Sequence, residues 1–226
     1  MSVELSLSPT PRTTVTRGRN RAVDDRAELH RLLETALIAH VGVVADGHPA
    51  VLPVTFAVDL EGPDDGGTLY IHGSVAAGWL RRSRDAGVCV TITELDGLVA
   101  ARSAFHHSMN YRSAVVMGTA RIVEDPAEKL HALALTIDHM IPGRSATLRS
   151  STRKELAATS VLAVPLREAS MKVRAEGPID EPEDIEAGVW AGVIPIRRVA
   201  EAAVSGEDSH DNVPTDVTRR AAELSR

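Results

Sequence analysis

The sequence predicts a mainly β protein in which an antiparallel barrel carries flanking helices. Short apolar segments follow one another along the chain, and turn signals such as Asp46-Gly47 and Asp96-Gly97 separate them. Helical patterns are inserted late and do not alternate regularly with the strands, which argues against a doubly wound sheet. With 226 residues, 43% of them hydrophobic and 25% charged, the chain can bury a sizeable core.

The N-terminal half contains most of the predicted strands. Residues 1–22 are rich in Ser, Thr, Pro and Arg and have no hydrophobic period, so we interpret them as a flexible arm before a domain over residues 23–203. A helix begins near Asp24, and four leucines keep helical spacing after it. Pro53 indicates an edge or a bulge in the second strand. Strands are predicted over 38–44, 50–58, 68–72, 88–92 and 98–101, with a short helix over 79–85.

The second half combines longer helices with further strands. Asp125 is the expected N-cap of a helix that runs to Met140, with Pro126 at its first position and Glu128 in capping-box register. Residues after Ala203 are expected to form a polar C-terminal tail, 204–226. Strands are predicted over 111–123, 161–166, 170–174 and 189–196, a helix over 152–160, and an acidic loop over 177–188.

Charge and composition exclude several classes of protein. The net charge of −6 argues against general nucleic-acid binding. No apolar run approaches the ~20 residues that cross a membrane, and residues 1–21 lack a signal core, so we expect a cytoplasmic protein. The single cysteine, Cys89, excludes an intramolecular disulfide and is expected to be a buried, inert thiol in a strand.

The segment 103–113 concentrates chemistry that the rest of the chain lacks. The chain has two Phe, two Tyr and two Trp, and one Phe and one Tyr fall in this segment. Its donors, guanidinium and aromatic faces suit a flat, polar ligand that carries a phosphate, although a solvated loop entering a strand has the same appearance. The candidate residues are His106, His107, Ser108, Met109, Asn110, Tyr111 and Arg112.

A second candidate lies where the third strand meets the short helix. The strand ends in His72-Gly73-Ser74, and backbone N–H groups at such a junction bind phosphate, with the Ser74 hydroxyl as a further donor. Arg81 and Arg82 follow within the helix. A Gly-Ser turn before a helix is also a common structural feature. Thr55, in the second strand, could contact a flat ring or belong to the core.

Together these segments resemble the pyridoxamine 5'-phosphate oxidase-like split-barrel family, in its flavin-nucleotide-binding branch with the nitroimidazole-resistance-type proteins. The matching segments are 72–74, 87–91, 96–99, 101–113 and 190–193. The resemblance implies a split β-barrel homodimer with FMN at the subunit interface. It implies further that Ser74 meets the FMN phosphate, that 106–112 line the same cleft, that the strand before Thr55 faces the isoalloxazine, and that Trp190 belongs to a late Trp-Ala-Gly strand.

One departure from the family bears on the cofactor. This branch often has a Ser-Arg pair at the positions of Ala77 and Gly78. The seryl hydroxyl and the guanidinium that would bind the phosphate are therefore missing here. FMN would then be held weakly, or the site would prefer another ligand, unless Arg81 compensates from the helix.

The resemblance supports two functions. The first is an FMN-dependent oxidoreductase acting on an unknown small molecule. The alternative is a non-catalytic flavin- or haem-binding carrier, in which His72, His106 or His107 ligates the iron. A metal hydrolase built on His106-His107 is disfavoured, because adjacent residues of a strand point to opposite sides.

Overall fold

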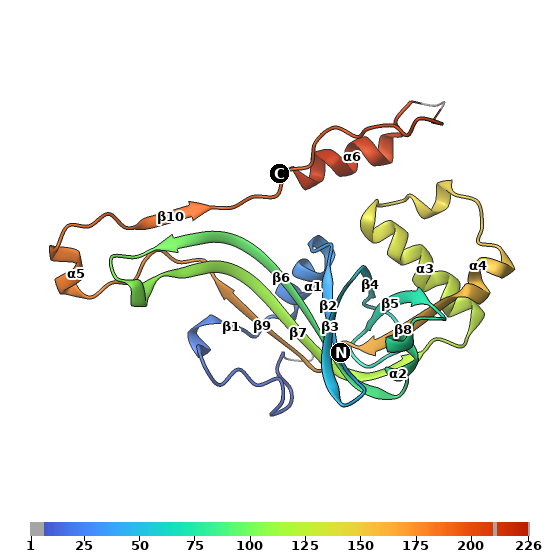
Figure 1. Cartoon of the computed structure of the whole chain (residues 1–226), viewed down its shortest axis with the longest axis horizontal. Coiled ribbons are helices and arrows are strands. Elements are labelled where there is room, and N and C mark those ends of the chain that lie inside the picture. The colour runs from blue at the N-terminus through green and yellow to red at the C-terminus, as the bar shows by residue number, and fades with distance from the viewer. Residues whose placement is uncertain (1–6, 210–211, 226) are drawn as a thin grey trace, which may run out of the picture.

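The computed structural model describes residues 7–209 and 212–225, which form a single antiparallel sheet with helices around it (Figure 1). The main path of the sheet is β3-β2-β6-β7-β8-β5-β4, and β1, β9 and β10 pair outside this path. The strands are β1 Ala22–Val23, β2 Ala39–Ala45, β3 His48–Val54, β4 Phe56–Asp59, β5 Thr68–Ser74, β6 Ala86–Ala100, β7 Ser108–Ile122, β8 Thr159–Pro165, β9 Ala169–Arg174 and β10 Gly192–Pro195. This architecture confirms the mainly β split barrel with flanking helices.

The helices lie outside the sheet, and α1 seals the barrel core. Leu29, Leu32 and Leu33 of α1 are 0–1% exposed and pack with Phe56 and the apolar faces of the central strands. Burial of such side chains is the main stabilising contribution of the barrel. The helices are α1 Arg26–Thr35, α2 Gly78–Arg82, α3 Pro126–Met140, α4 Arg153–Ala158, α5 Pro182–Glu186 and α6 Thr215–Leu224, with 3₁₀ turns η1 Arg19–Arg21, η2 Ala104–His106 and η3 Ser145–Thr147.

Strands β6 and β7 are 15 residues each, and their outer halves extend beyond the barrel as an arm (Figure 1). Strand β10 pairs with β6 along this arm, while β9 pairs with β7. The predicted turn at Asp96-Gly97 is wrong, because β6 continues through it with a bulge between Leu95 and Gly97. A Cβ atom on Gly97 would lie 3.1 Å from the Ile194 carbonyl oxygen, so the glycine permits the close approach of β10.

The predicted strand over 50–58 is divided at Thr55. Strand β3 pairs with β2, whereas β4 pairs with β5. Strand β3 ends the main path of the sheet, which confirms the edge position inferred from Pro53. The exposed Thr55 is the point at which the chain leaves one side of the barrel for the other.

Helix α3 begins as predicted, with one difference. The Asp125 carboxylate accepts hydrogen bonds from the backbone N–H groups of Ala127 and Glu128, at 2.6 and 3.3 Å. The Glu128 side chain does not complete a capping box, because Arg121 and Tyr70 bind its carboxylate. A complete capping box is found instead at the start of α4, between Thr152 and Glu155.

The N-terminal segment packs on the barrel. In the flexible N-terminal segment predicted over residues 1–22, Leu7 is 4% exposed and the Ser8 N–H donates to the Ala169 carbonyl at 2.7 Å. Residues 1–6 of that arm lie outside the described residues.

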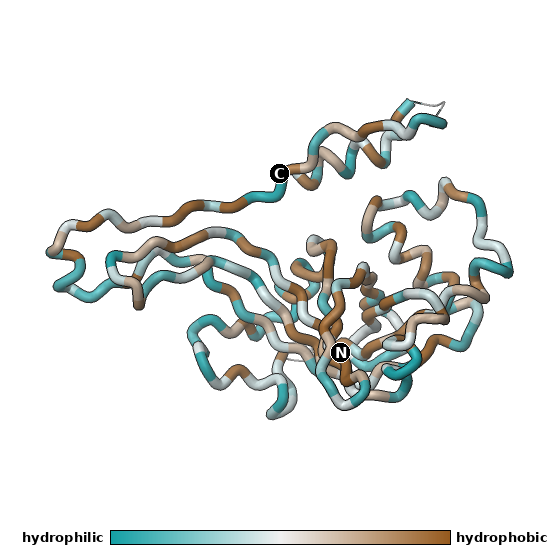
Figure 2. The backbone as a smooth tube through the Cα atoms, viewed as in Figure 1, coloured by the Kyte–Doolittle hydropathy of each residue, from teal (hydrophilic) through white to brown (hydrophobic). Residues whose placement is uncertain are grey.

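The polar tail expected over 204–226 contains a helix, α6. Val217, Arg220, Ala221 and Leu224 form its half-buried stripe, which is short and interrupted by an arginine and therefore gave no clear helical signal. Figure 2 shows hydrophobic residues in the barrel strands and again along the segment that carries β10. No helix of the described residues is long and apolar enough to cross a membrane.

Candidate functional site

A cavity of about 530 Å³ lies beside His72. His72 is on β5, opposite Val161 of β8, and its ring is half-buried. The ring Nδ1 is buried and has no hydrogen-bond partner among the described residues. Nε2 of the same ring is not buried and has no hydrogen-bond partner among the described residues, so it is the ring nitrogen left open to a group in the cavity. The cavity is lined by His72, Leu130, Leu133, Ala134, Thr136, Ile137, Met140, Ser145, Leu148, Arg149, Ser150, Ser151 and Thr159.

Most of the apolar lining of the cavity comes from α3. Leu130, Met140 and the following Leu148 line the cavity and are yet 45%, 38% and 47% exposed. Burial lowers the pKa of His72, so its imidazole is neutral at physiological pH and keeps a nitrogen lone pair. A neutral imidazole at an apolar wall can bind a metal centre that a flat apolar ligand carries.

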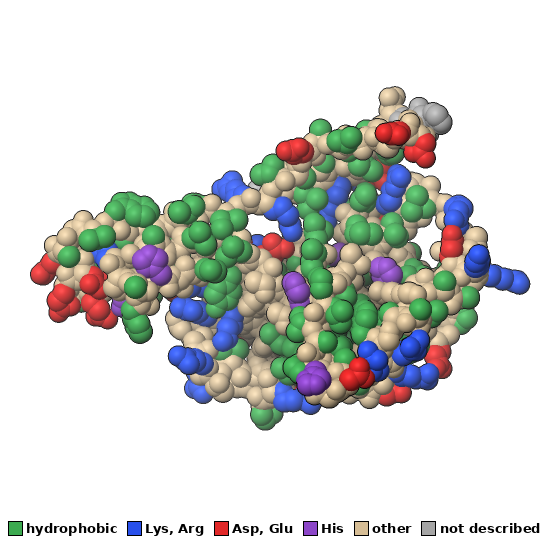
Figure 3. All heavy atoms as spheres, viewed as in Figure 1, with side chains coloured by type: hydrophobic (Ala, Val, Ile, Leu, Met, Phe, Trp, Pro, Cys, Tyr) green, Lys and Arg blue, Asp and Glu red, His purple; other side chains and the backbone are tan. Residues whose placement is uncertain are grey.

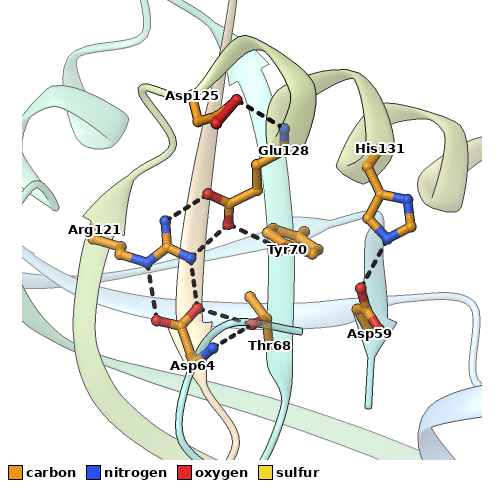
Figure 4. A network of polar contacts seen from close by, with 8 residues as sticks. All are labelled: Asp59, Asp64, Thr68, Tyr70, Arg121, Asp125, Glu128 and His131. Carbon is orange, nitrogen blue, oxygen red and sulfur yellow. Dashed lines mark hydrogen bonds and ion pairs between the residues drawn. The ribbon is translucent and has the colours of Figure 1, made fainter. Parts of the chain in front are cut away.

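A network of charges fixes the N-terminal half of α3 against the barrel (Figure 4). Arg121 of β7 makes a two-pronged contact with Asp64, at 2.9 and 2.7 Å, and also donates to Glu128 of α3. The Tyr70 hydroxyl donates to the same Glu128 carboxylate at 3.0 Å, and Thr68 donates to Asp64 at 2.8 Å. Burial, followed by the contact with Glu128, raises the pKa of Tyr70 to about 12. The cavity wall is therefore held by bidentate ion pairs instead of hydrophobic contact alone.

Helix α6 holds the other end of α3. Arg220 donates to the backbone carbonyls of Met140 and His139, at 2.8 and 3.1 Å, and Arg219 donates to the carbonyl of Pro142. These are the carbonyls that a helix C-terminus leaves without intrahelical partners, and a cation there complements the helix dipole.

The turn after β5 is the second candidate location. A Cβ on Gly73 would lie 2.6 Å from Leu80 Cδ1, so the glycine is needed for α2 to pack on β5. The exposed Ser74 hydroxyl accepts from the Ala76 N–H at 3.2 Å.

The two arginines of this turn lie in different places. Arg81, which we predict to compensate for Gly78, donates from Nη1 to the Val75 carbonyl at 3.5 Å. The guanidinium of Arg82 lies beside Gly78 instead, 3.3 Å from the position of a Cβ on that glycine. The i,i+4 spacing from Gly78 to Arg82 is the signal that could have identified this residue.

The predicted residues of the central segment lie on the arm, and several have structural partners. Asn110 is 9% exposed and accepts from Arg174 Nη1 and from the Glu176 N–H. Arg112 makes a bidentate ion pair with Asp96, at 3.0 and 2.8 Å, which raises the pKa of Arg112.

The histidines and aromatics of the arm are more open. His107 Nδ1 donates to the Ser103 carbonyl at 2.9 Å, and His106 Nε2 lies 3.7 Å from a Glu181 carboxylate oxygen. Trp190 is 68% exposed, and its ring lies against Gly192. Strand β10 begins at Gly192, so Trp190 precedes the strand instead of belonging to it. Tyr111 is half-buried. A cavity of about 410 Å³ brings together His107, Ser108 and Met109 with Leu98, Val99, Ala100 and Ile194.

Within one chain, the predicted site residues therefore form two separate groups. His72 lies in the barrel beside α3, and the turn from Ser74 to Arg82 follows it, whereas residues 106–112 lie at the outer part of the arm (Figure 1). The cavity at His72 and the cavity at His107 share no lining residue. Among the described residues, no group of three or more His, Cys, Asp or Glu side chains is arranged to hold a metal ion.

The chain belongs to the pyridoxamine 5'-phosphate oxidase family, whose model matches residues 25–173. It is similar to the flavocytochrome Anf3 from Azotobacter vinelandii, with 34% identity over 94% of this chain and 98% of that one and a TM-score of 0.87. It is also similar to the FAD and heme binding protein from Mycobacterium smegmatis, with 41% identity over 87% and 95% of the two chains and a TM-score of 0.79.

A more distant similarity joins the chain to a Bacteroides thetaiotaomicron protein described as a 5-nitroimidazole antibiotic resistance protein. The identity is 26%, over 67% of this chain and 86% of that one, with a TM-score of 0.53. The predicted family is thereby confirmed, and a nitroimidazole-resistance-type protein is among the similar structures. No match was found among curated proteins.

Proposed function

We propose that this protein binds both a flavin and a haem, and that His72 ligates the haem iron. The observation that carries the proposal is the half-buried His72, whose ring nitrogens have no hydrogen-bond partner among the described residues, at a cavity of about 530 Å³ with apolar side chains from α3. The cavity size lies in the range of small-molecule and cofactor sites. Two solved relatives above 30% identity bear names that include a haem or a cytochrome, which supports the same function.

The residues of the cavity fit a haem. Apolar side chains of α3 offer contact to a flat macrocycle, and the neutral imidazole offers the iron a nitrogen ligand. A bound haem supplies one-electron chemistry, and a flavin can exchange electrons with it. The chain's own contribution is to orient the iron through His72 and to exclude water with Leu130, Met140 and Leu148.

The visible spectrum of the purified protein tests this function. We expect a Soret band together with flavin absorption, and we expect His72→Ala to lose the Soret band while the flavin bands remain. His106→Ala and His107→Ala are the matched controls, because these histidines lie on the arm and line no part of the His72 cavity. A Soret band that survives in His72→Ala and disappears in either control would assign the iron to the arm.

For the flavin, we propose that the Ser74–Arg82 turn binds a phosphate and that FAD fits better than the FMN expected from the sequence. A terminal phosphate carries up to two negative charges and favours a dedicated guanidinium, which Gly78 lacks. Each phosphate of the FAD diphosphate carries one charge; the guanidinium of Arg82 beside Gly78 can meet a phosphate of either flavin, so the preference for FAD rests on the absent Ser-Arg pair at Ala77 and Gly78. The name of the Mycobacterium smegmatis relative includes FAD. Chromatography of the flavin released by heat identifies it directly.

We also propose a homodimer in which the arm is the contact surface. Phe105, Trp190 and Ile194 are 91%, 68% and 54% exposed, and Figure 3 shows hydrophobic side chains along the arm. Exposed apolar surface of this kind marks an interface. In the dimer that we propose, residues 106–112 of one arm meet the Ser74–Arg82 turn of the other copy. Light scattering at micromolar concentration tests this, because a mass of 24.1 kDa would mean a monomer.

A flavin-dependent oxidoreductase is the second candidate function. The open cavity at His107, Ser108 and Met109 favours it, because a small substrate could enter there. Anaerobic bleaching of the flavin by NADH or NADPH, followed by reoxidation with a nitroaromatic compound, tests this activity. A flavin that neither nucleotide reduces would leave the carrier function.

A further inference from the structure

We infer that Arg149, together with Ser150 and Ser151, binds the carboxylates of the ligand in the His72 cavity, which are the propionates of a haem. The inference rests on the proposed function of that cavity. It assigns a role to the loop between α3 and α4, which carries no candidate residue from the sequence. The argument starts from how polar groups are distributed around the cavity.

The charged side chain of the cavity comes from the α3–α4 loop, whereas His72, Thr136 and Thr159 are uncharged polar residues of the sheet and of α3. The wall from α3 consists mostly of apolar side chains, whereas Arg149, Ser150 and Ser151 are exposed residues of the α3–α4 loop. Of the residues that line the cavity, Arg149 alone carries a full charge. A ligand matched to this surface has an apolar body and an anionic edge, and a haem has both.

The guanidinium of Arg149 is already oriented. Glu155 accepts two hydrogen bonds from it, at 3.0 and 2.6 Å, and Arg149 Nη1 also donates to the Ser150 carbonyl at 3.0 Å. These contacts use three of the five N–H donors of a guanidinium among the described residues. The remaining donors, including Nε–H, are left for a second carboxylate. The Glu155 hydrogen bonds raise the pKa of Arg149, so the side chain stays cationic.

The loop that carries Arg149 is anchored at both ends. Near its start, the Ser145 N–H and hydroxyl both donate to the Asp138 carboxylate of α3, at 2.8 and 2.7 Å. At its end, Thr152 and Glu155 form the capping box of α4. Arg149 therefore stands between two fixed points, and little conformational entropy is lost when a ligand binds there.

The test compares two probes on the full chain freed of haem: hemin, and hemin dimethyl ester, whose propionates are blocked. Titrations followed at the Soret band give the two affinities. We expect the wild type to prefer hemin by about tenfold to a hundredfold, the range of one charge-assisted hydrogen-bonded contact. Arg149→Gln should lose most of this preference and bind the ester as the wild type does.

Arg153→Gln is the matched control, because Arg153 is an exposed arginine of the adjacent α4 and does not line the cavity. Its preference for hemin should be unchanged. The inference is overturned if Arg149→Gln keeps the full preference, or if the wild type binds both probes equally. The failure of the proposed function looks different, because neither probe would then give a Soret band that depends on His72.

Discussion

Replacing Arg121 tests the idea that buried ion pairs hold the wall of the His72 cavity. Arg121 joins Asp64 of the β4–β5 loop to Glu128 of α3, and the three side chains are 33%, 13% and 18% exposed. Arg121→Met keeps the length of the side chain and leaves two largely buried carboxylates without their cation. Breaking a fully buried pair costs about 3–5 kcal/mol, and the partial exposure of Arg121 reduces this to about 2–4 kcal/mol.

The magnitude translates into a thermal shift. At about 2–4 °C for each kcal/mol in a domain of this size, the melting temperature of Arg121→Met should fall by roughly 4–16 °C. Arg84→Met is the control, because Arg84 pairs with Glu124 on the surface, where both side chains are more than half exposed. That exposed pair should contribute about 0–1 kcal/mol. Urea unfolding of the three proteins measures both effects.

The pH dependence separates the ion-pair argument from a simple packing loss. Burial would raise the pKa of Asp64, but hydrogen bonds from Arg121 and Thr68 and the Arg121 charge hold it below its usual value. In Arg121→Met this support is gone, the Asp64 carboxylate takes up a proton more readily in the folded state, and the deficit in stability should shrink as the solution is acidified. A deficit equal to that of Arg84→Met, or one that does not change with pH, would refute the reasoning.

Three further predictions concern the buried histidines, the Ser74–Arg82 turn that we propose for the flavin phosphate, and α6. Burial lowers the pKa of His72 and His139, so the unfolded chain binds protons more readily than the folded one below about pH 6.5. The free energy of unfolding from urea titrations should therefore be highest above that pH and fall as the solution is acidified. Arg82→Gln should weaken flavin binding by about tenfold or more in fluorescence titrations, and Arg81→Gln should weaken it less; the reverse order would exclude Arg82 as the phosphate ligand. Arg220→Ala should destabilise the protein by about 1–2 kcal/mol and speed hydrogen exchange in the last turn of α3, and protection unchanged there would mean that α6 does not hold this helix.

The sequence patterns predicted most elements of the barrel, because strands and capped helices have local signals. Asp125 and Pro126 marked the start of α3, and the apolar spacing that follows marked its extent. The Asp96-Gly97 prediction was wrong because an Asp-Gly dipeptide is found both in turns and in β-bulges. Here β10 pairs with β6 across Gly97, and the strand continues with a bulge. That pairing involves residues about one hundred positions apart in the chain and has no local signal.

The candidate site was predictable only in part, for a related reason. His72 stood out by its position at a strand end, but the cavity beside it is formed by α3 and the α3–α4 loop, and their contact with β5 is tertiary. Arg112 and Asn110 have ligand-like side chains, yet Asp96 and Arg174 bind them within the arm. Residue type alone does not reveal whether a polar side chain already has a hydrogen-bond partner within the protein.

The two anchors of α3 explain how the sheet and this helix can keep a cavity between them. A helix that only rested on β5 by apolar contact could slide, and a cavity between the two would collapse, because apolar side chains relax into empty space. Here Glu128 ties the first turn of α3 to the barrel through Arg121, and Arg220 ties its last turn to α6. Four apolar residues that line the cavity lie between these two contacts: Leu130, Leu133, Ala134 and Ile137. Charges at the ends therefore set the width of the cavity, and the side chains between them are left free to contact the ligand that we propose.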